Sequence, residues 1–210
     1  MDERKEFLLH LFDKVWDDIG STIKVIWQSI VILLGVIATI IFTKANIVPI
    51  TTTYTIAMIA IAWILAHVEN AAYWFNRNLV IIANIERQFL NEDDSEQIHF
   101  YFTAHRPAKM VPHFQLQYWF LIMMALCLLL YYSTAKLLPF FKKFPNPSIS
   151  HYIFSSVYFP YITAMIGILF ICYFRNKNIE KYNEFKKLSP GKPFTKKIAY
   201  VHGHGGENLS

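Results

Sequence analysis

The sequence predicts an all-α integral membrane protein with four transmembrane helices, both chain ends in the cytoplasm, and helical extensions on the cytoplasmic side. Three observations lead to this prediction. First, 54% of the 210 residues are hydrophobic and only 17% are charged, whereas soluble domains carry about 25% charged residues. Second, the chain contains four long uncharged stretches. Third, its lysines and arginines gather on alternate sides of these stretches.

The uncharged stretches span residues 25–43, 45–68, 110–135 and 144–174. Each is long enough for a transmembrane helix, because about 20 apolar residues cross ~30 Å of hydrocarbon. This pattern excludes a soluble enzyme and a disordered chain. Both cysteines, Cys127 and Cys172, lie inside these stretches, which excludes a secreted scaffold held by disulfides. The acidic start of the chain predicts no cleavable signal peptide, so the first helix is expected to remain as an anchor.

The basic residues determine the predicted orientation. Sixteen lysines and arginines lie before the first stretch, between the second and third, and after the fourth, against four in the two other loops. Loops rich in lysine and arginine stay in the cytoplasm. We therefore expect a protein of the cell inner membrane with both termini inside. Three spanning helices with one re-entrant helix would reverse the C-terminus and remain the alternative.

Residues 1–22 are predicted to form an N-terminal amphipathic cytosolic helix. Over 5–19, apolar side chains recur every three or four residues, and Gly20-Ser21 is expected to end the helix. Its polar face is mostly acidic, which anionic lipid would repel, so we expect it to pack on other cytosolic helices. The alternative is a helix lying among the lipid headgroups. Residues 23–135 then hold transmembrane helices 1–3.

The second transmembrane helix is predicted to continue into the cytoplasm, over residues 50–91. No Pro or Gly occurs from Thr51 to Leu90, and apolar residues recur at helical spacing beyond Val68. The last ~20 residues would project about 30 Å and must bury this stripe. The N-terminal helix, the C-terminal tail and a neighbouring subunit are the candidates to cover it.

An oligomer or partner interface is expected on this extension. The alternative for its charged residues is a solvated helix face. The predicted interface residues are Phe75, Leu79, Ile82, Arg77, Glu86 and Arg87.

The remaining segments follow the same pattern. Residues 92–112 are predicted as a cytosolic connector, and the third transmembrane helix follows over about 114–134. Residues 136–174 hold the outer loop and transmembrane helix 4, with Pro160 inside that helix. Residues 175–210 form a basic cytosolic tail, whose helix is expected to break at Ser189-Pro190-Gly191.

The uncharged stretches lack ionisable side chains near their middles, apart from His67 close to a cytosolic end. Proton relays, coupled transporters and voltage sensors need such residues, and so does intramembrane hydrolysis. The sequence therefore predicts no enzyme, no catalytic residue, no metal site and no cofactor. A passive pore remains open, because hydroxyls and amides can line one. Each hydroxyl can instead bond to its own helix. The pore-lining candidates are Gln28, Thr39, Thr52, Thr55, Ser155 and Thr163.

The tail carries eight lysines and arginines. The plain interpretation is that they keep the tail inside and contact anionic headgroups, at ~1 kcal/mol per residue. The alternative is a surface for phosphates, a nucleotide or nucleic acid, with interleaved aromatic side chains for stacking. The residues expected to contact an anionic ligand or lipid are Arg175, Lys177, Lys181, Lys186, Lys187 and Lys192.

The layout combines short spans, little external mass, and a helix over Glu69–Leu90 with Asn-Arg-Asn and Glu-Arg-Gln segments. It resembles the small multi-pass membrane effectors of bacterial antiphage defence, the SLATT type and related four-span proteins. The resemblance lies in architecture. It implies an oligomer that depolarises or permeabilises the inner membrane when a cytosolic partner or a nucleotide signal arrives.

The leading hypothesis is a homo-oligomeric inner-membrane channel or pore-forming effector in contact with membrane lipids. It would be gated by a cytosolic protein or by a nucleotide or nucleic-acid signal. Oligomerisation is required, because a 24.6 kDa chain with four spans can hardly enclose a water path alone. One alternative is a non-conducting sensor or scaffold that recruits a soluble effector to its cytosolic helices. Another is a small lipid-modifying enzyme or carrier, which requires a polar cluster at the aromatic outer ends.

Overall fold

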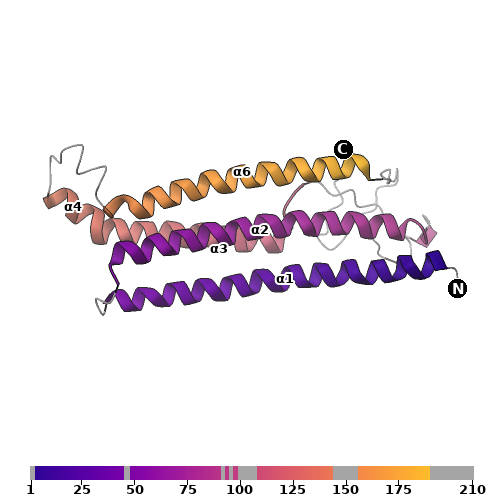
Figure 1. Cartoon of the computed structure of the whole chain (residues 1–210), viewed down its shortest axis with the longest axis horizontal. Helices are drawn as coiled ribbons and strands as arrows, with labels where there is room; N and C mark the ends of the chain where they lie inside the picture. The colour runs from indigo at the N-terminus through magenta and orange to yellow at the C-terminus, as the bar shows by residue number, and fades with distance from the viewer. Residues whose placement is uncertain are drawn as a thin grey trace. The chain divides into compact units, whose positions relative to one another are not determined.

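The computed structural model describes residues 3–44, 48–90, 93–94, 97–98, 108–143 and 156–189. Every element in these residues is helical, which confirms the predicted all-α class for this part of the chain (Figure 1). In chain order the elements are α1 (Glu3–Lys44), α2 (Ile50–Glu86), α3 (Pro112–Tyr132), the π-helix η2 (Ser133–Leu137), α4 (Leu138–Lys143), the 3-10 turn η3 (Ser156–Tyr158) and α6 (Phe159–Leu188).

Within the described residues, four helical segments are long and apolar enough to cross a membrane. They are Glu3–Gly35, Ile50–Glu86, Pro112–Lys143 and Ser156–Leu188. Four was the number predicted from the uncharged stretches. Insertion and orientation in a bilayer stay predictions.

The chain divides into two compact units. Unit 1 combines Met1–Val25, Glu69–Gln115 and Arg175–Ser210, and unit 2 combines Ile26–Val68 and Leu116–Phe174. All 15 acidic residues and sixteen of the 20 basic residues fall in the sequence ranges of unit 1. Three of the four boundaries lie within two residues of the charge that ends an uncharged stretch. The boundaries between the compact units therefore nearly coincide with the ends of the uncharged stretches.

The helix α1 runs unbroken from Glu3 to Lys44, so the predicted break at Gly20-Ser21 is wrong. A glycine inside a helix costs only about 1 kcal/mol relative to alanine. Buried side chains recur on both sides of it, at Val15, Ile19 and Ile26. The burial of these side chains stabilises the helix on both sides of Gly20 and offsets the cost of the glycine.

The helix α2 is continuous from Ile50 to Glu86, which confirms one long second helix. It ends about five residues earlier than predicted. The N–H of Gln88 donates to the carbonyl of Ile85 at 2.9 Å, and the N–H of Phe89 donates to that of Glu86 at 3.0 Å. These bonds span three residues and tighten the last turn, as is common at helix ends.

The third helix continues past its predicted end near 134. After α3 the chain passes through η2 into α4, which ends at Lys143, so residues 136–143, expected at the start of the outer loop, are helical. The N–H of Leu138 donates to the carbonyl of Ser133, five residues earlier. Pro139 has no N–H to donate, and the wider π-turn before it lets the helix continue around its ring.

The fourth long helix, α6, begins at Phe159, so Pro160 is its second residue and not an interior one. Proline is well tolerated there, because the N–H groups of a first turn have no helical partner. The helix runs through Arg175 to Leu188, and its end agrees with the predicted break after that residue.

Unit 2 has an unusually apolar outer surface. Large side chains that are at least half exposed include Leu116, Trp119, Met123, Leu126, Leu130, Ile166, Leu169 and Phe170. Lipid-facing helices carry such a surface, because hydrocarbon replaces water around them. The exposed apolar surface is thus evidence for a membrane environment that does not depend on helix length.

Two helices of unit 2 approach closely at Gly167 of α6. A Cβ atom built there would lie 2.9 Å from the Cβ of Ala62 on α2. That separation is shorter than carbon atoms tolerate, so the contact requires glycine at this position. Small residues allow the same close approach between membrane helices in general.

We predict that Gly167→Ala lowers the thermal unfolding midpoint of the purified protein by several degrees, because the added methyl group pushes α6 from α2. The double variant Gly167→Ala, Ala62→Gly moves the methyl group to the other helix and should regain most of the loss. Circular dichroism during heating measures both. A loss that the second substitution does not restore would contradict the contact.

Candidate functional site

The segment Glu69–Glu86 of α2 is the buried centre of unit 1. Leu79, Val80, Ile82 and Ala83 are at most 1% exposed. Side chains from the rest of the same unit contact this segment: the ring of Phe75 packs edge-on against that of Phe114 at 5.5 Å. The apolar stripe predicted from the sequence is therefore covered by the chain itself.

The predicted interface residues divide accordingly. Phe75, Leu79 and Ile82 are buried, whereas Arg77, Glu86 and Arg87 are half-buried. Their role toward a second subunit or partner stays a prediction. The three apolar side chains are buried in their own chain. A partner could therefore reach them only if unit 1 opened, or it could bind the three charged side chains instead.

A polar cluster joins α2 to α6. It contains Glu69 and Arg175, the first charged residues after the uncharged stretches 45–68 and 144–174. The Glu69 carboxylate lies 3.9 Å from Nε of Arg175. The amide of Asn178, also buried, donates to the backbone carbonyl of Glu69 at 3.5 Å. The Glu69 side chain is only 9% exposed, whereas that of Arg175 is 58% exposed. The pair is long, and only one of its members is buried.

Burial raises the pKa of the Glu69 carboxyl above its ordinary value, and the positive charge of Arg175 opposes this shift only in part. Desolvation disfavours the ionised carboxylate more than a distant, solvated guanidinium favours it. The ionised form of Glu69 is therefore a source of local instability where α2 and α6 meet.

Two further contacts surround α2. The Asn76 amide, 4% exposed, donates to the carbonyl of Lys109 at 2.9 Å, which ties the connector to the helix. The guanidinium of Arg77 lies over the ring of Trp74 at 4.9 Å and over that of Phe185 at 5.4 Å. Such cation–π stacking links Arg77 of α2 to Phe185 of α6.

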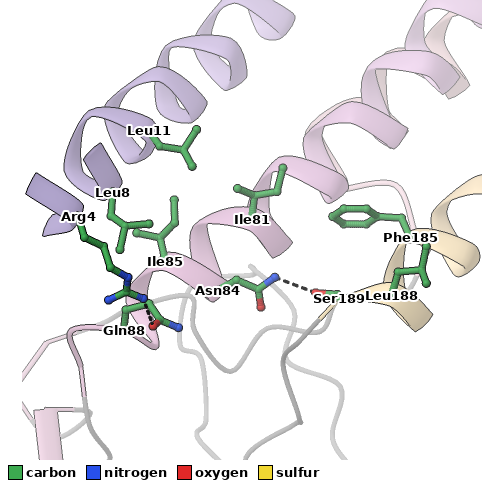
Figure 2. Close-up of a pocket in the computed structure, with 10 residues that line it drawn as sticks. All are labelled: Arg4, Leu8, Leu11, Ile81, Asn84, Ile85, Gln88, Phe185, Leu188 and Ser189. Carbon is green, nitrogen blue, oxygen red and sulfur yellow. Dashed lines mark hydrogen bonds between the residues drawn. The ribbon is translucent and has the colours of Figure 1, made fainter. Parts of the chain in front are cut away.

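Unit 1 also contains an open groove of about 400 Å³ formed by three helices. Figure 2 shows leucine and isoleucine side chains of α1 and α2 along one part of it, with Phe185 and Leu188 of α6 opposite. Two hydrogen bonds cross the groove's polar edge, from Arg4 to Gln88 at 3.0 Å and from Asn84 to Ser189 at 2.8 Å. The lining residues are Arg4, Leu8, Leu11, Ile81, Asn84, Ile85, Gln88, Phe185, Leu188 and Ser189.

The residues predicted to contact an anionic ligand or lipid lie on α6, apart from Lys192, which is outside the described residues. Arg175, Lys177, Lys181 and Lys187 are exposed, and Lys186 is half-buried. Lys177 and Lys181 are one helical turn apart on the solvent side. This arrangement agrees with contacts to anionic headgroups, which stay a prediction.

The pore-lining candidates lie mostly near helix ends. Gln28 and Thr52 are exposed, and Thr55 and Thr163 are half-buried. The hydroxyl of Thr55 donates to the carbonyl of Thr51 at 2.8 Å, within its own helix. The side chain of Thr39 and all of Ser155 lie outside the described residues. Their role in a pore stays a prediction.

Unit 2 contains a hydroxyl cluster that the sequence did not predict. The hydroxyl of Tyr132, a fully buried residue, lies 3.2 Å from that of Thr51 and donates to the carbonyl of Val157 at 3.0 Å. Next to it, the hydroxyls of Ser133 and Tyr161 are hydrogen-bonded. The cluster joins α2, α3 and α6 near their predicted outer ends. Sequence signals were the Tyr131-Tyr132 pair and the threonines after Pro49.

The lipid-enzyme alternative requires a polar cluster at this end, and one is present. Its hydroxyls bond to one another and to the backbone, which gives them a structural role. Among the described residues, no group of three or more His, Cys, Asp or Glu side chains is placed to hold a metal ion.

Comparison with protein-family models, with curated proteins and with solved structures found no match for this chain.

We predict that Glu69→Gln raises the thermal unfolding midpoint at pH 7.5 by about 2–4 °C, the shift that ~1 kcal/mol produces in a chain of this size. The amide keeps the shape but carries no charge to desolvate. A carboxyl whose pKa is raised on folding binds protons more tightly in the folded state. The wild-type midpoint should therefore rise as the pH falls through that raised pKa, and the variant should lose this rise.

Arg175→Gln is the matched control, because it removes the opposing charge and leaves the carboxylate buried. Its midpoint should fall at pH 7.5 and recover as the pH falls. A lower midpoint for Glu69→Gln at pH 7.5 would contradict the dominance of burial over the ion pair.

Proposed function

We propose that this chain is a multi-pass protein of the cell inner membrane that acts as a homo-oligomeric channel or pore-forming effector. Unit 2 lies in the lipid, and the helices within it are the membrane-spanning segments. Unit 1 lies in the cytoplasm and receives the activating signal, a protein or a nucleotide or nucleic acid. The architectural resemblance to antiphage effectors supports a role in defence.

The continuity of three helices carries the proposal. Each of α1, α2 and α6 extends without interruption from the sequence range of unit 2 into that of unit 1. An α-helix transmits displacement along its axis because its backbone hydrogen bonds keep it stiff. A ligand that rearranges unit 1 therefore acts on the membrane-spanning segments without any additional coupling element.

The Glu69–Arg175 pair is well placed to control this rearrangement. It ties α2 to α6 at the first charged residue of each helix, and burial of Glu69 weakens the tie. A weak, partly buried contact is easily exchanged for another one. The pair is thus a suitable latch between a closed and an open arrangement.

Exposed polar groups on membrane helices support oligomerisation. Gln28 lies on α1 within the uncharged stretch and is exposed in the single chain. In lipid, an amide side chain is stabilised by hydrogen bonds to a neighbouring helix. A second copy of the chain supplies such a helix.

The second candidate function is a non-conducting sensor or scaffold. It is favoured by the distribution of polar groups, because the groove and the Glu69 cluster lie in unit 1. In unit 2, by contrast, the Thr55 hydroxyl is bonded to its own helix and offers little to a pore.

Ion flux from liposomes that contain the full chain tests the proposal. We predict that Arg175→Ala, which releases the latch, increases potassium flux several-fold over the wild type. Lys181→Ala removes an exposed charge of the same helix and should leave the flux unchanged. Chemical cross-linking in the same liposomes should yield dimers and larger species.

Absence of flux in the wild type and both variants, with a chain that stays monomeric, would contradict the channel. Co-purification of a stoichiometric soluble protein under those conditions would support the scaffold.

A further inference from the structure

The last residue that the structure describes lies at the edge of the groove in unit 1. This residue, Ser189, lines the groove, and residues 190–210 follow it in the sequence. Leu188, beside it, also lines the groove and is 85% exposed. We propose that the groove is the docking site for the tail of the same chain, with residues 194–201 lying against its apolar side chains.

The groove presents mainly an apolar surface. Six of its ten lining side chains are aliphatic or aromatic, and they come from α1, α2 and α6. The polar side chains at its edge bond to one another, since Gln88 accepts a hydrogen bond from Arg4 and Asn84 donates one to Ser189. An occupant is therefore stabilised by the apolar area that it removes from water.

The sequence at the end of α6 is typical of a chain reversal. Phe185 lines the groove one helical turn before Leu188 (Figure 2), so a tail that docks must turn back after Ser189. The residues Ser189-Pro190-Gly191-Lys192 place proline and glycine at the two central positions of a four-residue turn. A type II turn prefers this order and brings its first and fourth residues within about 7 Å. The sequence thus favours a return of the chain toward the groove.

The segment after this turn carries apolar residues at a spacing that suits a groove. Phe194, Ile198 and Val201 stand at positions i, i+4 and i+7. Helical peptides that bind apolar grooves place their anchor side chains at this spacing. Lys192 and Lys196 fall on the opposite side of such a helix. A docked segment would bury its apolar face and keep these charges in water.

Attachment at the edge of the groove favours the tail over other apolar occupants. Four residues separate Ser189 from Phe194, and a linker this short gives an effective concentration of about 1 mM. At that concentration, a groove that binds the segment with a dissociation constant of ~0.1 mM is occupied about nine-tenths of the time. A free ligand lacks this advantage, and so does a segment of another protein.

The inference goes beyond the proposed function, because docking of the tail requires neither a pore nor an oligomer. Within that function, a docked tail would hold the parts of α1, α2 and α6 that line the groove together, and a signal that displaces it would release them. The tests measure docking alone. An absent ion flux would therefore leave their result unchanged.

The first test uses the full chain in lipid nanodiscs, with the photoreactive residue p-benzoylphenylalanine at position 198. After irradiation, mass spectrometry should locate crosslinks on peptides that contain Leu8 or Ile81. A mixture of isotope-labelled and unlabelled chains shows whether both crosslinked peptides belong to one chain. The photoreactive residue at position 196 is the matched control, because it has nearly the same tether and the opposite face. Its crosslinks to these peptides should be at least about fivefold fewer.

The accessibility of position 188 gives a second test that leaves the described helices intact. In a chain without its native cysteines, Leu188→Cys should react with a maleimide several-fold faster when Phe194→Ser and Ile198→Ser remove two anchors. Lys181→Cys is the control, because Lys181 is an exposed residue of the same helix outside the groove. Its rate should be the same with and without the anchors.

Equal crosslinking from positions 196 and 198 would overturn the proposal. Equal reaction of Leu188→Cys with and without the anchors would also overturn it. Crosslinks from position 198 that go only to lipid, to a second copy of the chain or to another protein would identify a different arrangement and would count against docking within one chain.

Discussion

The exclusion of ionised side chains from hydrocarbon is the constraint on which this structure depends. A charge at the centre of a bilayer costs about 2.5–3.5 kcal/mol even on the most permissive scales. In this chain every acidic residue and most basic residues lie in the sequence ranges of one unit. The other unit exposes leucine, methionine and aromatic side chains instead. A charged part and an apolar part within one chain are expected when one part contacts water and the other contacts hydrocarbon.

The same constraint explains where the polar contacts occur. Inside unit 2, the hydroxyl group of Tyr132 bonds to that of Thr51 and to the backbone, as polar groups in an apolar environment require. In unit 1, the cost of burying the charge of Glu69 exceeds what its ion pair with Arg175 returns. Its carboxylate is buried, its partner Arg175 lies 3.9 Å away and is exposed, and burial raises the pKa of Glu69.

Much of the fold followed from the sequence, because charges mark where uncharged helices end. The long α2 helix was predicted from the absence of Pro and Gly after Thr51, and the end of α6 from Ser189-Pro190-Gly191. The errors concern helix ends: Gly20-Ser21 was expected to end a helix, a loop was expected to begin at residue 136, and Pro160 was expected inside the fourth helix. Gly20 and Pro139 lie inside continuous helical structure, and Pro160 lies at a helix start. Local propensity was outweighed there by burial along the helix or by position within it.

The candidate sites were less predictable, because they depend on which helix faces meet. Periodicity marked the stripe with Leu79 and Ile82 as one to be buried, but not what covers it. The groove and the Tyr132 cluster join residues far apart in sequence and left no local pattern.

The placement of unit 2 in lipid and unit 1 in the cytoplasm is tested most directly by two-sided labelling. Single cysteines at positions 142 and 187, in a chain with Cys127 and Cys172 changed to alanine, would be exposed to an impermeant maleimide in intact cells. The account predicts rapid labelling at 142 and none at 187 until the membrane is opened. Labelling of both positions from one side, or recovery of the chain as a water-soluble particle, would contradict it.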